Sequence, residues 1–179
     1  MEFEEKQRLN FWWLYILLGI ETIIVCSVFL LDKNGLDLQS LKKMYFLPVL
    51  AVLLPYLLIY LINKSALVIK IDQYGIAYRF SPFAKRAKNI SWTQIDRLYL
   101  RKYDALSEYG GWGLRSKLWF KFNDKAYIFN DKSIGLQVEM GNAKRVLFSI
   151  AQSDELSLFL INFKRQYNIG AIETDVRER

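Results

Sequence analysis

The pattern of hydrophobic and polar positions divides this chain into two unlike parts. Two long apolar stretches stand near the N-terminus, Phe11 to Leu31 and Met44 to Ile62, separated by a short polar connector over residues 32–43. At about 1.5 Å per helical residue, each stretch would extend for about 30 Å, which is the thickness of a bilayer core. The pattern therefore predicts a transmembrane helical hairpin, preceded by an N-terminal cytoplasmic segment over residues 1–10.

From Ala66 onward, alternating apolar and polar positions replace the continuous apolar runs. Residues 66–71 and 76–80 predict a strand hairpin around the turn residues Asp72 to Gly75. Further strands are predicted over residues 95–103, 117–122, 126–129, 136–140 and 146–150. Ser153 is a suitable N-cap for a helix with an apolar stripe, formed by Leu156, Phe159, Leu160 and Phe163. Residues 63–169 thus predict an antiparallel barrel or sandwich with a C-terminal helix, and residues 170–179 a polar tail.

Strands followed by one C-terminal helix are the order of a pleckstrin-homology-like (PH-like) barrel. Two apolar helices, a strand hairpin and then Ile90-Ser91-Trp92-Thr93-Gln94-Ile95 resemble the bacterial membrane-anchored PH-like proteins. The segment Glu108 to Arg115, with Gly135-Leu136-Gln137, resembles one uncharacterised branch of them. The resemblance implies an α+β membrane protein, in which a transmembrane hairpin precedes a PH-like antiparallel β-barrel or sandwich. It implies a lipid- or protein-binding scaffold and no reaction.

The distribution of charge predicts how the hairpin is oriented in the membrane. The chain has a formal net charge of +7, but residues 1–62 carry −1 and residues 63–179 carry +8. Five Lys or Arg flank the ends of the hairpin against three in the connector, so the positive-inside rule predicts an inner-membrane protein with both termini cytoplasmic. A basic domain held there would be drawn to anionic lipid headgroups. Nucleic acid is the rival polyanion and is not the expected partner.

The residue types that are missing restrict the chemistry. The chain has no histidine, and its one cysteine, Cys26, lies in the first apolar stretch. These facts exclude a Cys/His zinc site and an intramolecular disulfide framework. Candidate nucleophiles such as Ser107, Ser116 and Ser149 have no histidine base. Carboxylates at Asp104, Glu108, Asp124 and Asp131 lie where turns favour them for local reasons. We therefore expect no catalytic residue, no metal and no cofactor.

Two segments carry candidate binding residues. In the first, the glycines at 110, 111 and 113 permit positive φ, and its candidates are Tyr109, Gly110, Gly111, Trp112 and Arg115. This segment is either an irregular strand whose Trp packs on the barrel or a binding loop, and it lacks the P-loop pattern. The second is basic, with Arg79, Lys85, Arg86 and Lys88 either solvated or in contact with lipid headgroups.

One predicted strand face alternates basic and aromatic residues, namely Arg97, Tyr99, Arg101 and Tyr103. This face is either an ordinary amphipathic surface or a surface for single-stranded nucleic acid.

Glu21 stands near the middle of the first apolar stretch. A bare carboxylate there would cost about 2.5–3.5 kcal/mol, so we expect a neutral Glu21 bonded to Tyr56, to a carbonyl freed by Pro55, or to a second subunit. The predicted function is a non-catalytic, membrane-anchored PH-like module at the inner face of the cytoplasmic membrane. It would bind a protein partner, its own copies or anionic lipid headgroups. The alternative is a subunit of a membrane enzyme or transporter complex that uses Glu21.

Overall fold

The computed structural model describes residues 1–9, 11–31, 46–82, 84, 86–117 and 121–177. Over these residues the chain forms nine β-strands, four α-helices and one 3-10 turn. It divides into two compact units, a β-rich unit made of Met1–Leu9 with Ser65–Arg179, and a helical unit made of Asn10–Lys64. The helical unit is therefore inserted in the sequence between two parts of the β-rich unit.

Two helices make up the helical unit, α1 (Trp12–Leu31) and α3 (Phe46–Lys64). They pack against each other with Leu18 and Ile59 buried. The Thr22 and Tyr56 hydroxyl groups are hydrogen-bonded at 3.0 Å. At the other end of the pair, the Phe11 amide donates to Asn63 Oδ1 at 3.2 Å. A few side chains thus fix the register of one helix against the other.

The structure of these helices contradicts the predicted transmembrane hairpin. A bilayer core requires about 20 consecutive, predominantly apolar helical residues. Within the part of the chain that the structure describes, no helix combines the length and the apolarity needed to cross a membrane. This finding overturns the predicted membrane fold, the two transmembrane helices and the inner-membrane localisation with cytoplasmic termini. The predicted connector over residues 32–43 lies outside the described residues.

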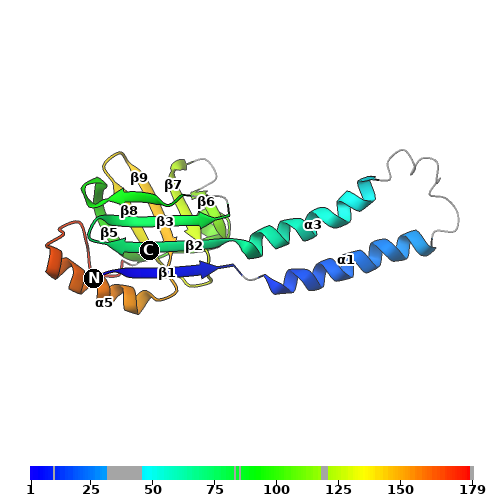
Figure 1. The fold of residues 1–179 in the computed structure, drawn as a ribbon, viewed down its shortest axis with the longest axis horizontal. Coiled ribbons are helices and arrows are strands. Elements are labelled where there is room, and N and C mark those ends of the chain that lie inside the picture. The colour runs from blue at the N-terminus through cyan, green and yellow to red at the C-terminus, as the bar shows by residue number, and fades with distance from the viewer. Residues whose placement is uncertain (10, 32–45, 83, 85, 118–120, 178–179) are drawn as a thin grey trace. The chain divides into compact units, whose positions relative to one another are not determined.

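The first sheet of the β-rich unit has four strands in the order β1 (Phe3–Arg8), β2 (Ala66–Asp72), β3 (Gly75–Ser81) and β4 (Lys88–Ser91), all antiparallel (Figure 1). The predicted β2–β3 hairpin is confirmed, with Asp72 opposite Gly75. Strand β1 was not predicted. It pairs with β2 from Phe3 opposite Ile71 to Arg8 opposite Ala66, so the chain leaves and re-enters this sheet at adjacent positions.

The second sheet has five strands in the order β5 (Ile95–Lys102), β8 (Ile134–Met140), β9 (Lys144–Ser149), β7 (Lys121–Ile128) and β6 (Gly113–Lys117). Strands β7 and β9 run parallel, whereas the other pairs are antiparallel. The predicted all-antiparallel barrel or sandwich is therefore corrected to two sheets, one of them mixed. The reason is that the β8–β9 hairpin inserts between β5 and β7, an order that residue alternation within a strand does not encode.

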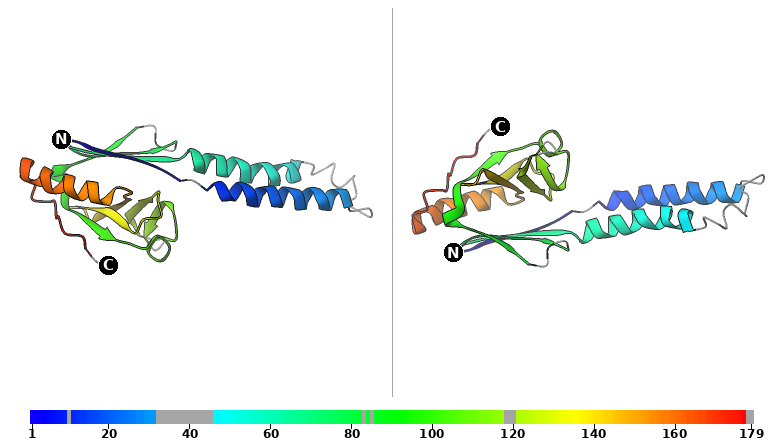
Figure 2. Two further views of the ribbon diagram at one scale, coloured as in Figure 1. Left: turned by 90° about the horizontal axis from the view of Figure 1, so that it is seen from below. Right: turned by 90° about the horizontal axis from the view of Figure 1, so that it is seen from above.

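Aromatic rings join the two sheets, which Figure 2 shows as facing layers. Tyr78 of β3 lies 5.2 Å from Tyr127 and 4.9 Å from Phe148, measured between ring centroids. Phe80 of the same strand lies 5.1 Å from Phe129. Tilted and edge-to-face contacts at these distances add to the stabilisation that burial of the rings provides. The apolar core of this unit therefore lies between its sheets.

Helix α5 (Ser153–Tyr167) confirms the predicted C-terminal helix, and it buries Leu156, Leu160 and Phe163. The predicted Ser153 cap is wrong, because Gln152 occupies the cap position and makes no side-chain cap hydrogen bond. The carboxylate of Glu5, from β1, instead accepts hydrogen bonds from the amides of Ala151 and Gln152 at 2.8 and 3.2 Å. A buried side chain that is distant in sequence thus satisfies amides at the start of the helix.

Glu5 belongs to a buried polar network that ties β1 to the second sheet. Gln7 Nε2 donates to the Glu5 carboxylate and, at 2.5 Å, to the carbonyl of Ser149. Ser149 Oγ donates to Gln7 Oε1 at 2.7 Å and accepts from the amide of Phe129 at 2.8 Å. These polar groups can be buried because they satisfy one another.

Candidate functional site

The glycine-rich segment begins with a short helix, α4 (Ala105–Tyr109). Asp104 caps it, since one carboxylate oxygen accepts from the amides of Leu106 and Ser107 at 2.9 and 3.0 Å. Gly110 ends the helix in the left-handed conformation, with φ of 72°, where a side chain would be strained. Gly110 therefore stops the helix, and the chain then enters β6 (Gly113–Lys117). The predicted irregular strand thus begins at Gly113, and its pairing with β7 shifts register between Ser116 and Lys117.

A buried ion pair fixes α4 to the second sheet. The guanidinium of Arg101 on β5 lies 3.0 Å from Glu108 Oε2, and it donates to Tyr109 Oη and to Gln137 Oε1, each at 3.0 Å. The Tyr109 hydroxyl donates in turn to Asp124 on β7 at 3.3 Å. The side chains of Arg101 and Glu108 are only 14% and 9% exposed. Groups from three strands thus hold the short helix in one position.

Arg101 and Glu108 stay charged at neutral pH, and the nearby tyrosines stay neutral. Burial disfavours the charged forms of Arg101 and Glu108, but their neighbours outweigh it. The pKa of Glu108 is lowered by Arg101 and by the Asp104 amide, and that of Arg101 is raised by Glu108 and Tyr109. Burial also raises the pKa of the Tyr109 hydroxyl far above its usual value, and that of Tyr103 to about 12. A charged pair beside neutral tyrosines supports the helix and offers no group poised for proton transfer near pH 7.

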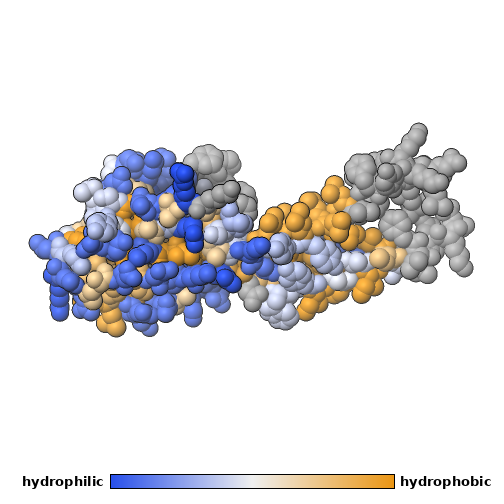
Figure 3. All heavy atoms as spheres, viewed as in Figure 1, coloured by the Kyte–Doolittle hydropathy of each residue, from blue (hydrophilic) through white to orange (hydrophobic). Residues whose placement is uncertain are grey.

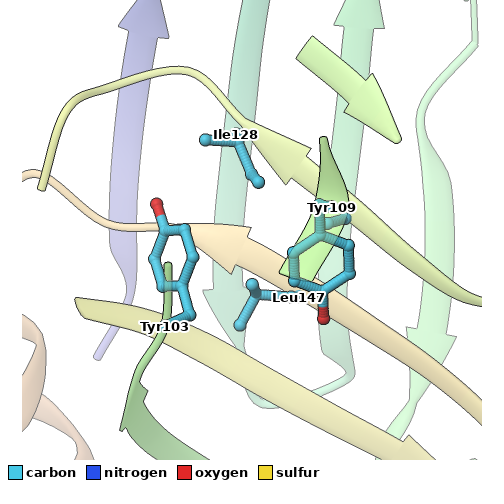
Figure 4. Close-up of a cluster of buried hydrophobic side chains, with 5 residues drawn as sticks. Tyr103, Tyr109, Ile128 and Leu147 are labelled. Atoms are coloured by element: carbon cyan, nitrogen blue, oxygen red, sulfur yellow. The ribbon is translucent and has the colours of Figure 1, made fainter. Parts of the chain in front are cut away.

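The two tyrosines also belong to an apolar cluster beneath α4. Tyr103 and Tyr109 pack with Ala126, Ile128 and Leu147, and all five are at least 96% buried. In the close-up of Figure 4, Leu147 of β9 lies between the two tyrosine rings. The helix is therefore held both by the polar network and by apolar packing.

A cavity of about 260 Å³ opens between α4 and the β7–β8 connection. Its lining comprises Tyr103, Asp104, Ala105, Leu106, Trp112, Asn130, Asp131, Lys132 and Ser133. Leu106 is 62% exposed and Trp112 is 38% exposed, so two large apolar side chains face solvent at this cavity. Sites for drug-sized ligands and cofactors usually measure about 300–1,000 Å³. The cavity is therefore suited to one large side chain.

The cavity walls are held by local hydrogen bonds. Arg115 Nε on β6 donates to the carbonyl of Trp112 at 2.9 Å, which braces the segment that carries the indole. On the opposite wall, Asn130 Oδ1 accepts from the amide of Lys132 at 3.0 Å. The amide of Tyr103 donates to the carbonyl of Ser133 at 2.8 Å and joins the walls. The cavity thus has a defined shape before any partner binds.

The structure separates the two predicted groups of binding residues. The first group lies together at α4 and the start of β6 and comprises Tyr109, Gly110, Gly111, Trp112 and Arg115. Of these, Tyr109 is buried in the apolar cluster beneath α4. The basic residues Arg79 and Lys88 are exposed on β3 and β4 of the other sheet, and Arg86 is exposed in the connection between these strands. Lys85 lies outside the described residues. The two groups do not form one site.

Sequence reasoning missed most of the cavity. Leu106 and the 130–133 segment line it, yet Asn130 and Asp131 read only as turn residues. One available signal was Asp104, an N-cap residue two positions before an exposed leucine. The meeting of this segment with residues 130–133 depends on strand pairing far apart in sequence, and no local signal reports it.

For Glu21, the predicted bond to Tyr56 is wrong, and the predicted bond to a second subunit stays a prediction. Its side chain is exposed on α1, whereas the Tyr56 hydroxyl bonds to Thr22. Among the described residues, no group of three or more His, Cys, Asp or Glu is placed to hold a metal ion. Comparison of the chain with protein-family models and with curated proteins gave no match. The resemblance to PH-like proteins therefore stays a prediction.

Proposed function

We propose that this chain is a non-catalytic protein-binding module, and that the cavity beside Trp112 receives an apolar side chain of a partner protein. The observation that supports this function is the pair of exposed apolar residues, Leu106 and Trp112, at a cavity whose walls are already fixed. Exposed tryptophan beside a pocket is typical of the residues that dominate protein interfaces. A preorganised helix limits the entropy lost on binding.

The chemistry of the cavity favours a peptide over a polyanion. Its rim carries Asp104 and Asp131 as well as Lys132, so the charges are mixed. The exposed basic side chains Arg79 and Lys88 belong to the other sheet. An apolar side chain would fill the cavity, and the peptide backbone around it would meet polar groups at the rim. Neither lipid headgroups nor nucleic acid matches this combination.

The test is selection of peptides from a displayed random library on the immobilised full-length chain, followed by fluorescence anisotropy with the best peptide. We expect selected peptides to share a large apolar residue. Trp112→Ala should weaken their binding at least tenfold, because about 1.4 kcal/mol corresponds to a factor of ten and interface anchors exceed 2 kcal/mol. The matched control is Tyr74→Ala, which removes an aromatic ring that is 76% exposed away from the cavity.

Two results would contradict the proposal. In the first, selected peptides bind the Trp112→Ala chain as tightly as the unaltered chain. In the second, no peptide is selected, and the chain instead binds vesicles containing phosphatidylglycerol in a manner that Arg79→Ala weakens and Trp112→Ala does not. That outcome would assign binding to the basic face of the first sheet.

A further inference from the structure

The outer edge of β5 is occupied by the C-terminal segment of the chain. Strand β5 ends the five-stranded sheet on one side, and the edge of a sheet presents backbone groups that can pair with another strand. Residues 171–177 run alongside it in the parallel direction, as Figure 2 shows. The amide of Leu98 donates to the carbonyl of Ala171, and the amide of Glu173 donates to the carbonyl of Leu98, each at 2.8 Å. The β5 edge thus pairs with an extended segment.

The pairing of this segment is irregular. Its two bridges join Ile172 to Leu98 and Arg177 to Arg101, so five steps along the segment span only three steps along β5. The extra residues lie between the bridges, where Asp175 and Val176 are exposed. A regular parallel strand would follow β5 without this excess and could pair along its whole length. The chain's own segment therefore uses the edge less fully than a regular strand could.

Side chains hold the segment at few points. Ile172 is fully buried and is its apolar anchor. The Glu173 carboxylate accepts from Arg97 Nε at 2.8 Å and pairs with Arg177 at 2.5 Å. The Arg177 guanidinium lies over the Tyr99 ring, 4.3 Å from its centroid. The charged side chains are 32–43% exposed, and ion pairs that solvent reaches contribute little to stability. Attachment thus rests on the buried Ile172 and on four backbone hydrogen bonds. Besides the two at Leu98, the amide of Arg177 donates to the carbonyl of Leu100 at 2.9 Å, and the amide of Lys102 donates to the carbonyl of Arg177 at 3.1 Å.

We propose that the outer edge of β5 is a second binding site, for an extended segment of a partner protein, and that the C-terminal segment competes with this partner for the edge. The partner strand runs parallel to β5, places an apolar residue where Ile172 lies, and follows it with an acidic residue facing Arg97. Backbone hydrogen bonds supply affinity and these two side chains supply selectivity, as in other cases of strand addition. The site is independent of the cavity beside Trp112.

The experiment uses the full-length chain and a fluorescein-labelled synthetic peptide with the sequence of residues 169–177. Ile172→Ser in the chain weakens its own segment, so we expect the peptide to bind this variant at least tenfold more tightly than the unaltered chain. A peptide carrying Glu173→Gln should bind less tightly than the parent peptide, since it loses the charge facing Arg97. Val176→Ser in the chain is the matched control and should leave binding unchanged, because Val176 is 45% exposed.

Amide hydrogen exchange on the same variants makes each outcome decisive. We expect faster exchange over residues 171–177 in the Ile172→Ser chain, and renewed protection of the Leu98 and Lys102 amides when peptide is added. Release of the segment without tighter peptide binding would overturn the proposal. So would a segment-exchanged dimer that excludes the peptide, since the edge would then belong to a second copy. Should Ile172→Ser fail to fold, Glu173→Lys changes only a partly exposed side chain and carries the same expectations.

Discussion

The two units of this chain treat their apolar side chains in opposite ways. In the β-rich unit, large side chains such as Leu67, Ile69 and Phe148 are fully buried. In the helical unit, Leu18 and Ile59 are the buried apolar side chains among those described. Many others there are at least 46% exposed, including Trp12, Trp13, Ile16, Leu17, Ile20, Ile23, Ile24, Leu50, Leu53, Leu54, Leu57, Leu58 and Tyr60. Figure 3 shows hydrophobic surface along these helices and mainly hydrophilic surface over the β-rich unit.

This contrast concerns the source of the folding free energy in each unit. The β-rich unit buries its apolar groups within itself, so its folding free energy has an internal source. Among the described residues, the helical unit holds its two helices together with a few contacts and leaves many large apolar side chains exposed. Substitutions should therefore have large effects on folding in the first unit and small effects in the second.

The largest effect is expected at Phe148, which is fully buried and lies among Tyr78 and Tyr127. Phe148→Ala should lower the free energy of unfolding by about 3–5 kcal/mol, because it removes buried area and leaves a cavity. Leu158→Ala is the control on α5, where the side chain is 64% exposed, and it should change stability by less than about 0.5 kcal/mol. Urea unfolding followed by circular dichroism compares them, and equal effects would remove the distinction between buried and exposed sites.

The next effect concerns the Arg101–Glu108 pair. Arg101→Met removes the guanidinium from the largely buried Glu108 carboxylate, which still accepts from the Asp104 amide at 3.1 Å, so we expect a loss of up to about 3 kcal/mol. Arg97→Met is the control, since the Arg97 side chain is 43% exposed and its ion pairs are worth about 1 kcal/mol or less. Urea unfolding at pH 7 measures both, and a larger loss for Arg97→Met would reverse the assignment.

The same pair predicts a dependence on pH. Because the pKa of Glu108 is lower in the folded chain than in the unfolded chain, its contribution is present above the unfolded pKa. It is lost as the pH falls through the folded value, since the unfolded state then takes up the proton first. Unfolding midpoints between pH 7 and pH 2 should therefore fall less steeply for Glu108→Gln than for the unaltered chain. Parallel curves would show that Glu108 contributes nothing to acid sensitivity.

A smaller effect is expected at Glu5, which joins β1 to the start of α5. Glu5→Gln keeps the shape but removes the charge that accepts from two backbone amides, and hydrogen bonds to charged groups contribute about 1.5–3 kcal/mol. We expect a loss near the lower end of that range. Glu4→Gln, on the exposed face of the same strand, should be close to neutral. Thermal unfolding of both variants checks this, and similar melting temperatures would exclude the bridging role of Glu5.

The smallest effect belongs to the helical unit. Thr22→Val removes the hydrogen bond to Tyr56 and should destabilise the helix pair by about 1 kcal/mol, without a measurable change in the β-rich unit. Amide hydrogen exchange over α1 is the suitable readout, because global unfolding follows the larger unit. Ile23→Ala, at a position that is 67% exposed, is the control. Coupled changes in β2 and β9 would show that the two units unfold together.

Local sequence signals predicted local structure. The turn residues Asp72 to Gly75 correctly placed the β2–β3 hairpin, and the apolar stripe from Leu156 to Phe163 correctly placed α5. Strand β1 was not predicted because two of its inward side chains, Glu5 and Gln7, are polar. Their burial depends on their bond to each other and on partners distant in sequence. Helix α4 was not predicted because five residues are too few to show a helical period.

The same limit applies to the sites. Trp112 was predicted as a binding candidate from its glycine neighbours, but residues 130–133 on the other wall of the cavity were not. The β5 edge depends on strand order and on the course of a polar C-terminal segment, neither of which follows from periodicity. The apolar runs indicated that residues 11–62 differ from the rest, and their length and near absence of charge suggested a bilayer. The structure ascribes the difference to two helices whose apolar side chains are exposed.

Residue-level native-state hydrogen exchange on the full-length chain tests the contrast between the units most directly. The account predicts that amides of β2, β8 and β9 exchange only through global unfolding. Amides of α1 and α3 should exchange at least about 100-fold faster through local opening, since few buried contacts hold the helix pair. Equal protection factors across both units, with the same response to denaturant, would contradict the claim that only the β-rich unit is stabilised from within.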